Sequence, residues 1–126
     1  MMSHDQWLNA LVTQVRQIAS REFQEQNWFR KDIAPGVNWV VEAYENLDDL
    51  TFDLFFEKYA KDFSASQLAA WVGFKNEFDR YGERLPKYPD VRNVFNDPGW
   101  QSIREAASRF VNAFEQTDPA SVAAQH

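Results

Sequence analysis

Several residue types are scarce in this chain of 126 residues, and each scarcity excludes a class of protein. There is no cysteine, which excludes a disulfide scaffold, a thiolate zinc site and cysteine catalysis. The four glycines stand singly, so the chain can form neither a GxGxxG loop nor a phosphate-binding Walker loop. No apolar run approaches the length of a membrane span, so the sequence predicts none.

Histidine is also scarce. The two histidines, His4 and His126, lie near opposite ends of the chain, and we expect both to be exposed to solvent. Without an internal histidine or any cysteine, Ser-His and Cys-His nucleophilic sites are nearly excluded. The Glu-x-x-His pairs of helical di-iron sites and the spacing of an EF-hand are both missing. We therefore predict a non-enzyme with no catalytic residue, no metal site and no cofactor.

Basic residues are outnumbered by acidic ones. Thirteen lysines and arginines stand against 19 acids, which gives a net charge of −6. Binding to nucleic acid or to an anionic membrane requires a basic surface, so the sequence predicts neither kind of partner. Residues 1–5 lack the basic stretch of a signal peptide, and we expect a cytoplasmic protein.

The residues that are plentiful suit one globular domain. Hydrophobic residues make up 44% of the chain and aromatic residues 16%, enough for a core without disulfides. Residues 117–126 contain no large apolar side chain apart from one valine. We predict a helical domain over residues 1–116 and a flexible tail over residues 117–126.

Helical spacing dominates the domain. Capping boxes at Ser3 and Ser64 predict helices that begin there, and the second is expected to run to about Glu83. Asp97, followed by a proline, predicts the start of the last helix. The apolar stripes of these three helices are Trp7, Leu8, Leu11, Val12, Val15, Ile18 and Ala19; Leu68, Trp71, Phe74, Phe78 and Tyr81; and Trp100, Ile103, Ala107, Phe110, Val111 and Phe114.

The middle of the chain is harder to assign. Pro35-Gly36 marks a break, and residues 37–46 fit either a helix or a strand; we favour a helix because no partner strand is visible. Thr51 is a candidate N-cap for a helix over 52–61, and 90–95 fits a short helical turn. Three aromatic residues near the break have weaker periodicity and are candidates for a surface or groove: Trp28, Phe29 and Trp39. We predict an all-α, single-domain bundle of five to six helices.

The negative charge is concentrated in one segment. Residues 42–62 carry seven acids and two lysines, a net charge of −5, whereas the sequences on either side are nearly neutral. On a helix over 52–61, Leu54 falls among the charged residues, opposite the aromatic face. An acidic rim around an apolar anchor is typical of a surface that binds a basic protein. A solvated helix face, with Leu54 packed under a loop, is the other interpretation. The predicted partner-binding residues are Glu42, Tyr44, Glu45, Asp48, Asp49, Asp53, Leu54 and Glu57.

In overall character the chain resembles the immunity proteins of bacterial toxin systems. The resemblance lies in its small size, its acidity, its lack of cysteine and the run LTFDLFFEKYAKDFSASQLAAWVGFKNEF over residues 50–78. It implies a cytoplasmic inhibitor that binds a cognate basic toxin domain, such as a nuclease. The motif of the nuclease-colicin immunity proteins is not present, and no functional residue is transferred. The oligomeric state is predicted to be a monomer or a weak homodimer.

Two alternatives stay open. A small helical ligand-binding domain or a carboxylate-dependent enzyme would have a deep cleft with two convergent carboxylates, because any of the 19 acids can pair in space. A phage-encoded inhibitor of a nucleic-acid-binding host protein would use the same charge complementarity. A flat acidic face favours either inhibitor over the enzyme.

Overall fold

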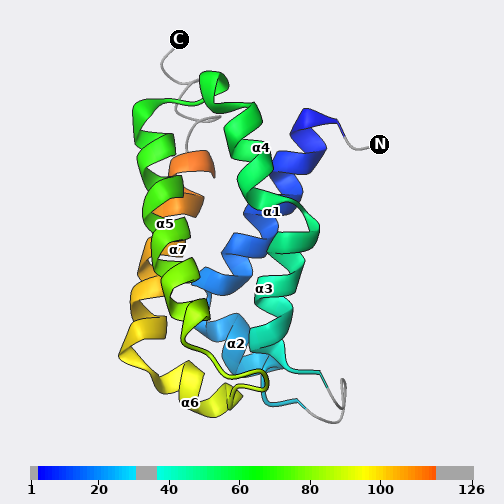
Figure 1. Cartoon of the computed structure of the whole chain (residues 1–126), viewed down its shortest axis with the longest axis vertical. Helices are drawn as coiled ribbons and strands as arrows, with labels where there is room; N and C mark the ends of the chain where they lie inside the picture. The colour runs from blue at the N-terminus through cyan, green and yellow to red at the C-terminus, as the bar shows by residue number, and fades with distance from the viewer. Residues whose placement is uncertain (1–2, 31–36, 116–126) are drawn as a thin grey trace.

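The computed structural model describes residues 3–30 and 37–115 and is helical throughout, with no strand in those ranges (Figure 1). The all-α bundle predicted from the sequence is confirmed. The elements in chain order are α1 (His4–Ala19), α2 (Arg21–Asn27), α3 (Trp39–Asp49), α4 (Phe52–Lys58), a short 3₁₀ turn η1 (Ala60–Asp62), α5 (Ala65–Glu83), α6 (Val91–Asn96) and α7 (Pro98–Glu115). The Pro35-Gly36 break, His126 and the tail over 117–126 lie outside the described residues.

The long helices pack in a chain of neighbours. Helix α7 lies between α5 and α1, and α1 also packs on α3, while α2 and α6 lie together at one end of the bundle (Figure 1). The seam between α3–α4 and α5 is packed less closely, and the ring of Tyr44 on Phe78 and the ring of Phe52 on Phe74 bridge it. This seam becomes important below, because a groove lies along it.

The helix starts follow the sequence signals. At Ser3 and at Ser64 both halves of the capping box form: the serine hydroxyl accepts from the backbone N–H three residues on, and that glutamine accepts from the serine N–H. The Asp97 carboxylate accepts from the Gly99 N–H at 2.9 Å. Residues 39–49 are helical, so the helix favoured over a strand is confirmed, and Asn38 caps it.

Thr51 is the exception among the predicted caps. It stands at the start of α4, but its backbone is left-handed, with φ 50° and ψ 53°, and its side chain caps no N–H. The hydroxyl instead donates to the Leu50 carbonyl at 2.7 Å, which also accepts from Trp7 Nε1 at 2.7 Å. This left-handed residue forms the corner at which α3 ends and α4 begins. Helix α4 also ends earlier than predicted, at Lys58 rather than at 61.

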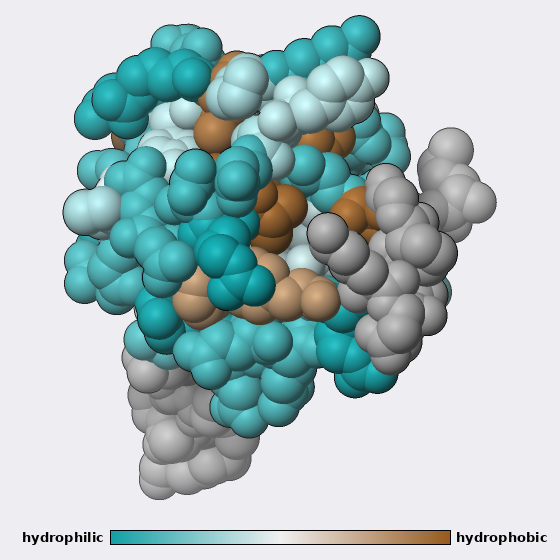
Figure 2. Space-filling view, turned by 90° about the horizontal axis from the view of Figure 1, so that it is seen from below, coloured by the Kyte–Doolittle hydropathy of each residue, from teal (hydrophilic) through white to brown (hydrophobic). Residues whose placement is uncertain are grey.

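The core follows the predicted stripes. From α1, Leu11, Val12, Val15 and Ile18 are buried, and every member of the α7 stripe is buried. Rings from α4, α5 and α7 meet in the centre, with Phe56 lying 5.2–5.7 Å, centroid to centroid, from Trp71, Phe114 and Phe110. At the end that carries α6 the described surface is mostly hydrophilic, with apolar residues showing only in its middle (Figure 2).

Trp28 is not a surface residue. Its side chain is buried against Trp100 and Phe95, so the surface role considered for it is wrong, whereas Trp28, Phe29 and Trp39 do line a hollow of about 420 Å³. Phe29 and Trp39 are half-buried beside the same cluster.

His4 also differs from the prediction. The side chain is 32% exposed, and its ring lies 4.4 Å from that of Tyr59 and 5.3 Å from that of Phe55. The first turn of α1 packs on α4, which a position near the end of the sequence does not reveal. His4 belongs structurally to the aromatic cluster at that end of the bundle.

A buried polar network, which the sequence patterns did not predict, joins α1, α2 and α7. Gln24 and Arg104 are 0% and 3% exposed. The Gln24 amide donates to the Gln17 and Ile18 carbonyls, and its oxygen accepts from Arg104 Nε at 2.8 Å and from Trp100 Nε1 at 3.3 Å. Arg104 also donates to the Phe95 carbonyl at 2.7 Å. The network satisfies the carbonyl groups at the end of α1, where the chain turns into α2.

Candidate interaction groove

The predicted partner-binding residues fall on more than one side of α3. Most of them are exposed: Glu45, Asp48, Asp49, Asp53, Leu54 and Glu57. Glu42 is half-buried and lines a small cavity of about 20 Å³ that faces α1 and α2, together with Gln14 and Trp28. Helical rotation explains the separation, because Glu42 and Tyr44 are two residues apart and therefore point to nearly opposite sides of α3. The acidic segment of the sequence is therefore not one continuous surface.

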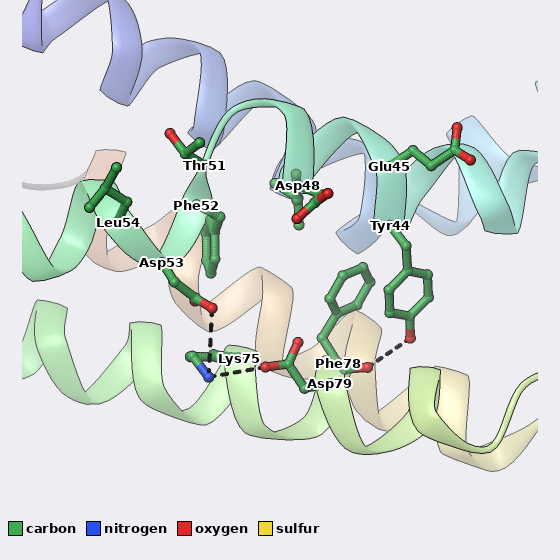
Figure 3. A pocket seen from close by; sticks show the side chains of 11 residues that line it. Tyr44, Glu45, Asp48, Thr51, Phe52, Asp53, Leu54, Lys75, Phe78 and Asp79 are labelled. Atoms are coloured by element: carbon green, nitrogen blue, oxygen red, sulfur yellow. Dashed lines mark hydrogen bonds and ion pairs between the residues drawn. The ribbon is translucent and has the colours of Figure 1, made fainter.

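A groove of about 530 Å³ lies between α3–α4 and α5 (Figure 3). Five of the predicted residues line it, and α5 supplies its opposite wall. The lining is Tyr44, Glu45, Leu47, Asp48, Thr51, Phe52, Asp53, Leu54, Lys75, Phe78 and Asp79. The groove exists because α3–α4 and α5 meet through side chains along the seam.

A second hollow of about 510 Å³ continues along the same seam. It shares Tyr44, Glu45 and Asp79 with the first, and the rest of its lining is Val40, Val41, Gly82, Glu83, Leu85, Pro86 and Pro89. Its walls are thus more apolar, with Glu83 adding one more acid. The two hollows together form one elongated groove, which we call the α3–α5 groove.

Tyr44 forms the ridge between the two hollows. Its ring stacks on that of Phe78 at 3.8 Å between centroids and 11° between planes, and its hydroxyl donates to the Phe78 carbonyl at 2.7 Å (Figure 3). Gly82 permits this approach, since a Cβ there would lie 2.6 Å from Tyr44 Cε1. Burial, followed by the nearby Tyr81 and Asp79, raises the pKa of Tyr44. Tyr44 is neutral at physiological pH and offers a partner its ring, because its hydroxyl is engaged.

The first hollow holds two carboxylates that converge on one lysine. Lys75 Nζ lies 3.0 Å from an Asp79 oxygen and 3.8 Å from an Asp53 oxygen, the first from its own helix and the second from α4 (Figure 3). The hydrogen bond to Asp79 is the largest cause that raises the pKa of Lys75, and the charge of Asp53 adds to it. Lys75 therefore stays protonated and neutralises part of the cluster.

Asp53 is the centre of the negative charge. Burial is the largest cause that raises its pKa, and the charges of Asp79, Glu57 and Asp48 raise it further, while Lys75 opposes them. One lysine therefore does not balance the surrounding acids. Five carboxylates and one lysine are found among the described residues that line the α3–α5 groove. A second cation placed there would relieve this repulsion.

Leu54 lies at one end of the groove and is 54% exposed. It does not pack under a loop, so that part of the alternative is wrong, while the interpretation of the acids as a solvated helix face stays open. Its neighbour Asp53 points toward Lys75, whereas Leu54 points away from α5, so the apolar side chain lies on the outer side of the acidic rim (Figure 3). A single exposed leucine is common on protein surfaces, and its position beside a groove is the notable feature.

The residues that α5 contributes were not among the predicted site residues. Lys75, Phe78, Asp79 and Gly82 stand at i, i+3, i+4 and i+7 and so share one face of the helix. That spacing was readable, together with the i, i+4 pair of Lys75 and Asp79. Nothing in the local sequence says that this face looks toward α3, because that depends on how α5 packs on α7.

No protein-family model, curated protein or solved structure matches the chain. None of the described helices is long and apolar enough to cross a membrane. In the described ranges, no group of three or more histidine, aspartate or glutamate side chains is arranged to hold a metal ion. The function is therefore argued from the groove itself.

Proposed function

We propose that this protein is a stoichiometric inhibitor that binds a basic protein, in the manner of an immunity protein that neutralises a bacterial toxin domain such as a nuclease. One observation carries the proposal: Leu54 is 54% exposed at the end of a groove whose rim carries Glu45, Asp48, Asp53 and Asp79. Apolar anchors ringed by charge concentrate binding energy in protein interfaces, and the charge steers the partner into place.

The charge also favours the class of partner. A nuclease binds polyphosphate through a basic surface, and an acidic groove competes for that surface. Nucleic acid and anionic membranes would be repelled by the same carboxylates. On this proposal the protein acts in the cytoplasm of the toxin-producing cell, as a monomer or a weak homodimer, and needs no cofactor. A phage inhibitor of a nucleic-acid-binding protein would use the same surface.

The test is binding and inhibition of the toxin domain encoded beside this gene. Asp48, Asp49, Asp53 and Glu57 are replaced together by Asn or Gln, and affinity is measured by calorimetry at low and high salt. We expect affinity to fall by at least about tenfold and its salt dependence to weaken, because rim charges act through long-range attraction. Circular dichroism checks that the variant is folded.

The matched control removes four acids away from the groove: Glu22, Glu25, Glu77 and Glu105. Both variants change the net charge equally, so a purely global charge effect weakens binding in both. Unchanged affinity in the variant that lacks Asp48, Asp49, Asp53 and Glu57 would remove these four acids from the interface. Absence of any inhibition of the toxin domain by the wild-type protein would refute the inhibitor function.

A carboxylate-dependent enzyme has two observations in its favour: the acidic surface is a groove and not a flat face, and Asp53 and Asp79 converge within it. Their side chains are 50% and 51% exposed, and the group between them is a protonated lysine. An acid–base pair works best when water is excluded and the two carboxylates differ in protonation. The pair therefore fits binding better, and D53N should leave any hydrolytic activity of the purified protein unchanged.

A further inference from the structure

We infer that the α3–α5 groove receives a basic amphipathic segment of the partner protein, whose cationic side chain replaces Lys75 between Asp53 and Asp79. The inference rests on the proposed function and specifies which part of the partner binds and how. Three features of the groove lead to it: its length, the alternation of apolar and acidic walls, and the position of Lys75.

The length of the groove suits a peptide segment better than one side chain. The two hollows, about 530 and 510 Å³, share Tyr44, Glu45 and Asp79 and run along α5 from Lys75 to beyond Gly82. Seven residues of helix span about 10 Å, so two turns of a partner helix fit along this stretch. A small cation such as a polyamine would leave most of the groove empty.

The walls differ along the groove. The second hollow is lined mainly by Val40, Val41, Leu85, Pro86 and Pro89, which suit apolar side chains. The first carries Asp48, Asp53 and Asp79, which suit a lysine or arginine. A segment with basic residues on one side and apolar residues on the other matches both walls, as helices that dock into grooves generally do.

Lys75 occupies the place where the partner's cation would bind. Its ammonium group lies 3.0 Å from Asp79 and 3.8 Å from Asp53, and its side chain is 30% exposed. Ion pairs of such exposure contribute little to stability, so Lys75 can leave at small cost. A partner arginine would then bridge the two carboxylates with a planar guanidinium, which pairs with carboxylates better than an ammonium group does.

The experiment uses two synthetic probes of identical composition. One is a lysine–leucine peptide arranged as an amphipathic helix, and the other is the same peptide scrambled. Binding to the full chain is measured by calorimetry or fluorescence anisotropy, with spermine as a small-cation comparison. We expect the amphipathic helix to bind more tightly than the scrambled peptide or spermine.

Paired variants locate the binding site. D53N/D79N should weaken binding of the amphipathic peptide about tenfold, whereas E22Q/E105Q, with the same change in net charge, should not. K75M should strengthen binding about threefold or more, because it leaves both carboxylates unpaired, whereas R109M at an exposed position of α7 should not. Circular dichroism and thermal melts show whether each variant is folded.

Several results would overturn the inference. Equal weakening by D53N/D79N and E22Q/E105Q would reduce the effect to net charge. Equal binding of the scrambled peptide or of spermine would show that the groove selects no segment. Self-association in sedimentation that D53N/D79N abolishes would make a second copy of this chain the occupant.

The toxin domain separates this inference from the proposed function. If that domain loses affinity for D49N/E57Q, two acids outside the groove lining, and keeps it for D53N/D79N, the groove is not the site and the inhibitor function stands. If the peptide binds as described and no toxin domain is inhibited, the groove binds a basic segment and the inhibitor function fails.

Discussion

The two charged clusters of this protein are built in opposite ways. At the α2–α7 contact, Arg104 and Gln24 are almost completely buried, and each polar atom described there has a partner within the chain. In the α3–α5 groove, Lys75, Asp53 and Asp79 are between 30% and 51% exposed and hold one another with excess negative charge. The first cluster is buried within the fold, whereas the ion pairs of the second are open to solvent.

The surroundings explain the difference. Burial is the largest cause that lowers the pKa of Arg104, to about 10, so the guanidinium remains charged at neutral pH and depends on its hydrogen bonds. In the groove, the charged side chains are 30–51% exposed, so water can solvate the charge that the ion pairs leave unbalanced. A polar group in the buried cluster is thus held in one arrangement, whereas a polar group in the groove can also be solvated by water. The following experiments, ordered from the largest expected effect to the smallest, test that contrast.

Replacing Arg104 should have the largest effect. R104M keeps much of the side-chain volume but leaves the Phe95 carbonyl and the Gln24 oxygen without the bonds that Arg104 donates. We expect the free energy of unfolding to fall by about 2–4 kcal/mol, measured by urea denaturation. K75M in the groove is the comparison and should change it by less than about 0.5 kcal/mol. Equal losses in the two variants would erase the distinction between the clusters.

The two glycines of α5 provide the second test. A Cβ at position 82 would lie 2.6 Å from the Tyr44 ring, whereas at position 73 nothing lies within 4 Å. G82A should therefore lower the free energy of unfolding by about 1–3 kcal/mol through overpacking. G73A should raise it by up to about 1 kcal/mol, because alanine favours a helix. Stabilisation by G82A would mean that Tyr44 does not hold the seam between α3 and α5.

Two aspartates with opposite pKa shifts provide the third test. The Gly99 N–H, and then the Tyr81 hydroxyl, lower the pKa of Asp97, whereas burial raises that of Asp53. The ionised Asp97 carboxylate therefore stabilises the fold fully above the pKa it has in the unfolded chain, about 4. This stabilisation is lost as the pH falls through the lower pKa that Asp97 has in the folded protein. D97A should cost about 1 kcal/mol at pH 7, with a smaller difference from the wild type below pH ~4.

The pKa of Asp53 is shifted in the opposite direction from that of Asp97. Its folded pKa lies above the unfolded one, so its ionised form opposes folding at neutral pH, and acid relieves this cost. D53N should thus leave the free energy of unfolding at pH 7 unchanged or raise it by less than about 0.5 kcal/mol. A loss of stability comparable to that of D97A would show that Asp53 serves the fold and is not held in reserve for a partner.

The smallest effect is expected at the corner between α3 and α4. Thr51 is the described non-glycine residue with positive φ, and a β-branched side chain is strained there. Asparagine tolerates this conformation, so T51N should raise the free energy of unfolding by at most about 0.3 kcal/mol, because loss of the Oγ1 bond to Leu50 offsets most of the relieved strain. A loss of stability would show that this hydroxyl bond outweighs the strain.

Much of the fold followed from short-range signals. The capping boxes at Ser3 and Ser64 and the cap at Asp97 set helix starts because they satisfy N–H groups within three residues. The α7 stripe predicted core residues because apolar side chains spaced three and four positions apart share one face of a helix. Thr51 was misjudged because a threonine before a helix is compatible with a cap, while its left-handed backbone depends on the packing of Trp7 against the corner.

Only one wall of the candidate groove, that of α3 and α4, was predicted from the sequence. The exposed acids of α3 and α4 and the exposure of Leu54 followed from helical rotation. Lys75, Asp79 and Gly82 were missed, and Glu42 was grouped with residues that it does not accompany. A net charge summed along the sequence cannot tell the two faces of one helix apart.

By itself, the sequence determined the helices, the identity of the core residues and the surplus of acid, because each depends on neighbours a few positions away. The sequence alone also excluded disulfides and a nucleotide-binding glycine loop, because it has no cysteine and its four glycines stand singly. Only the tertiary structure decided that α5 faces α3–α4 across a seam bridged by side chains, that Lys75 is held between two aspartates, and that Arg104 is buried. These features join residues from 22 to 80 positions apart, and the packing of α7 between α1 and α5 is what brings them together.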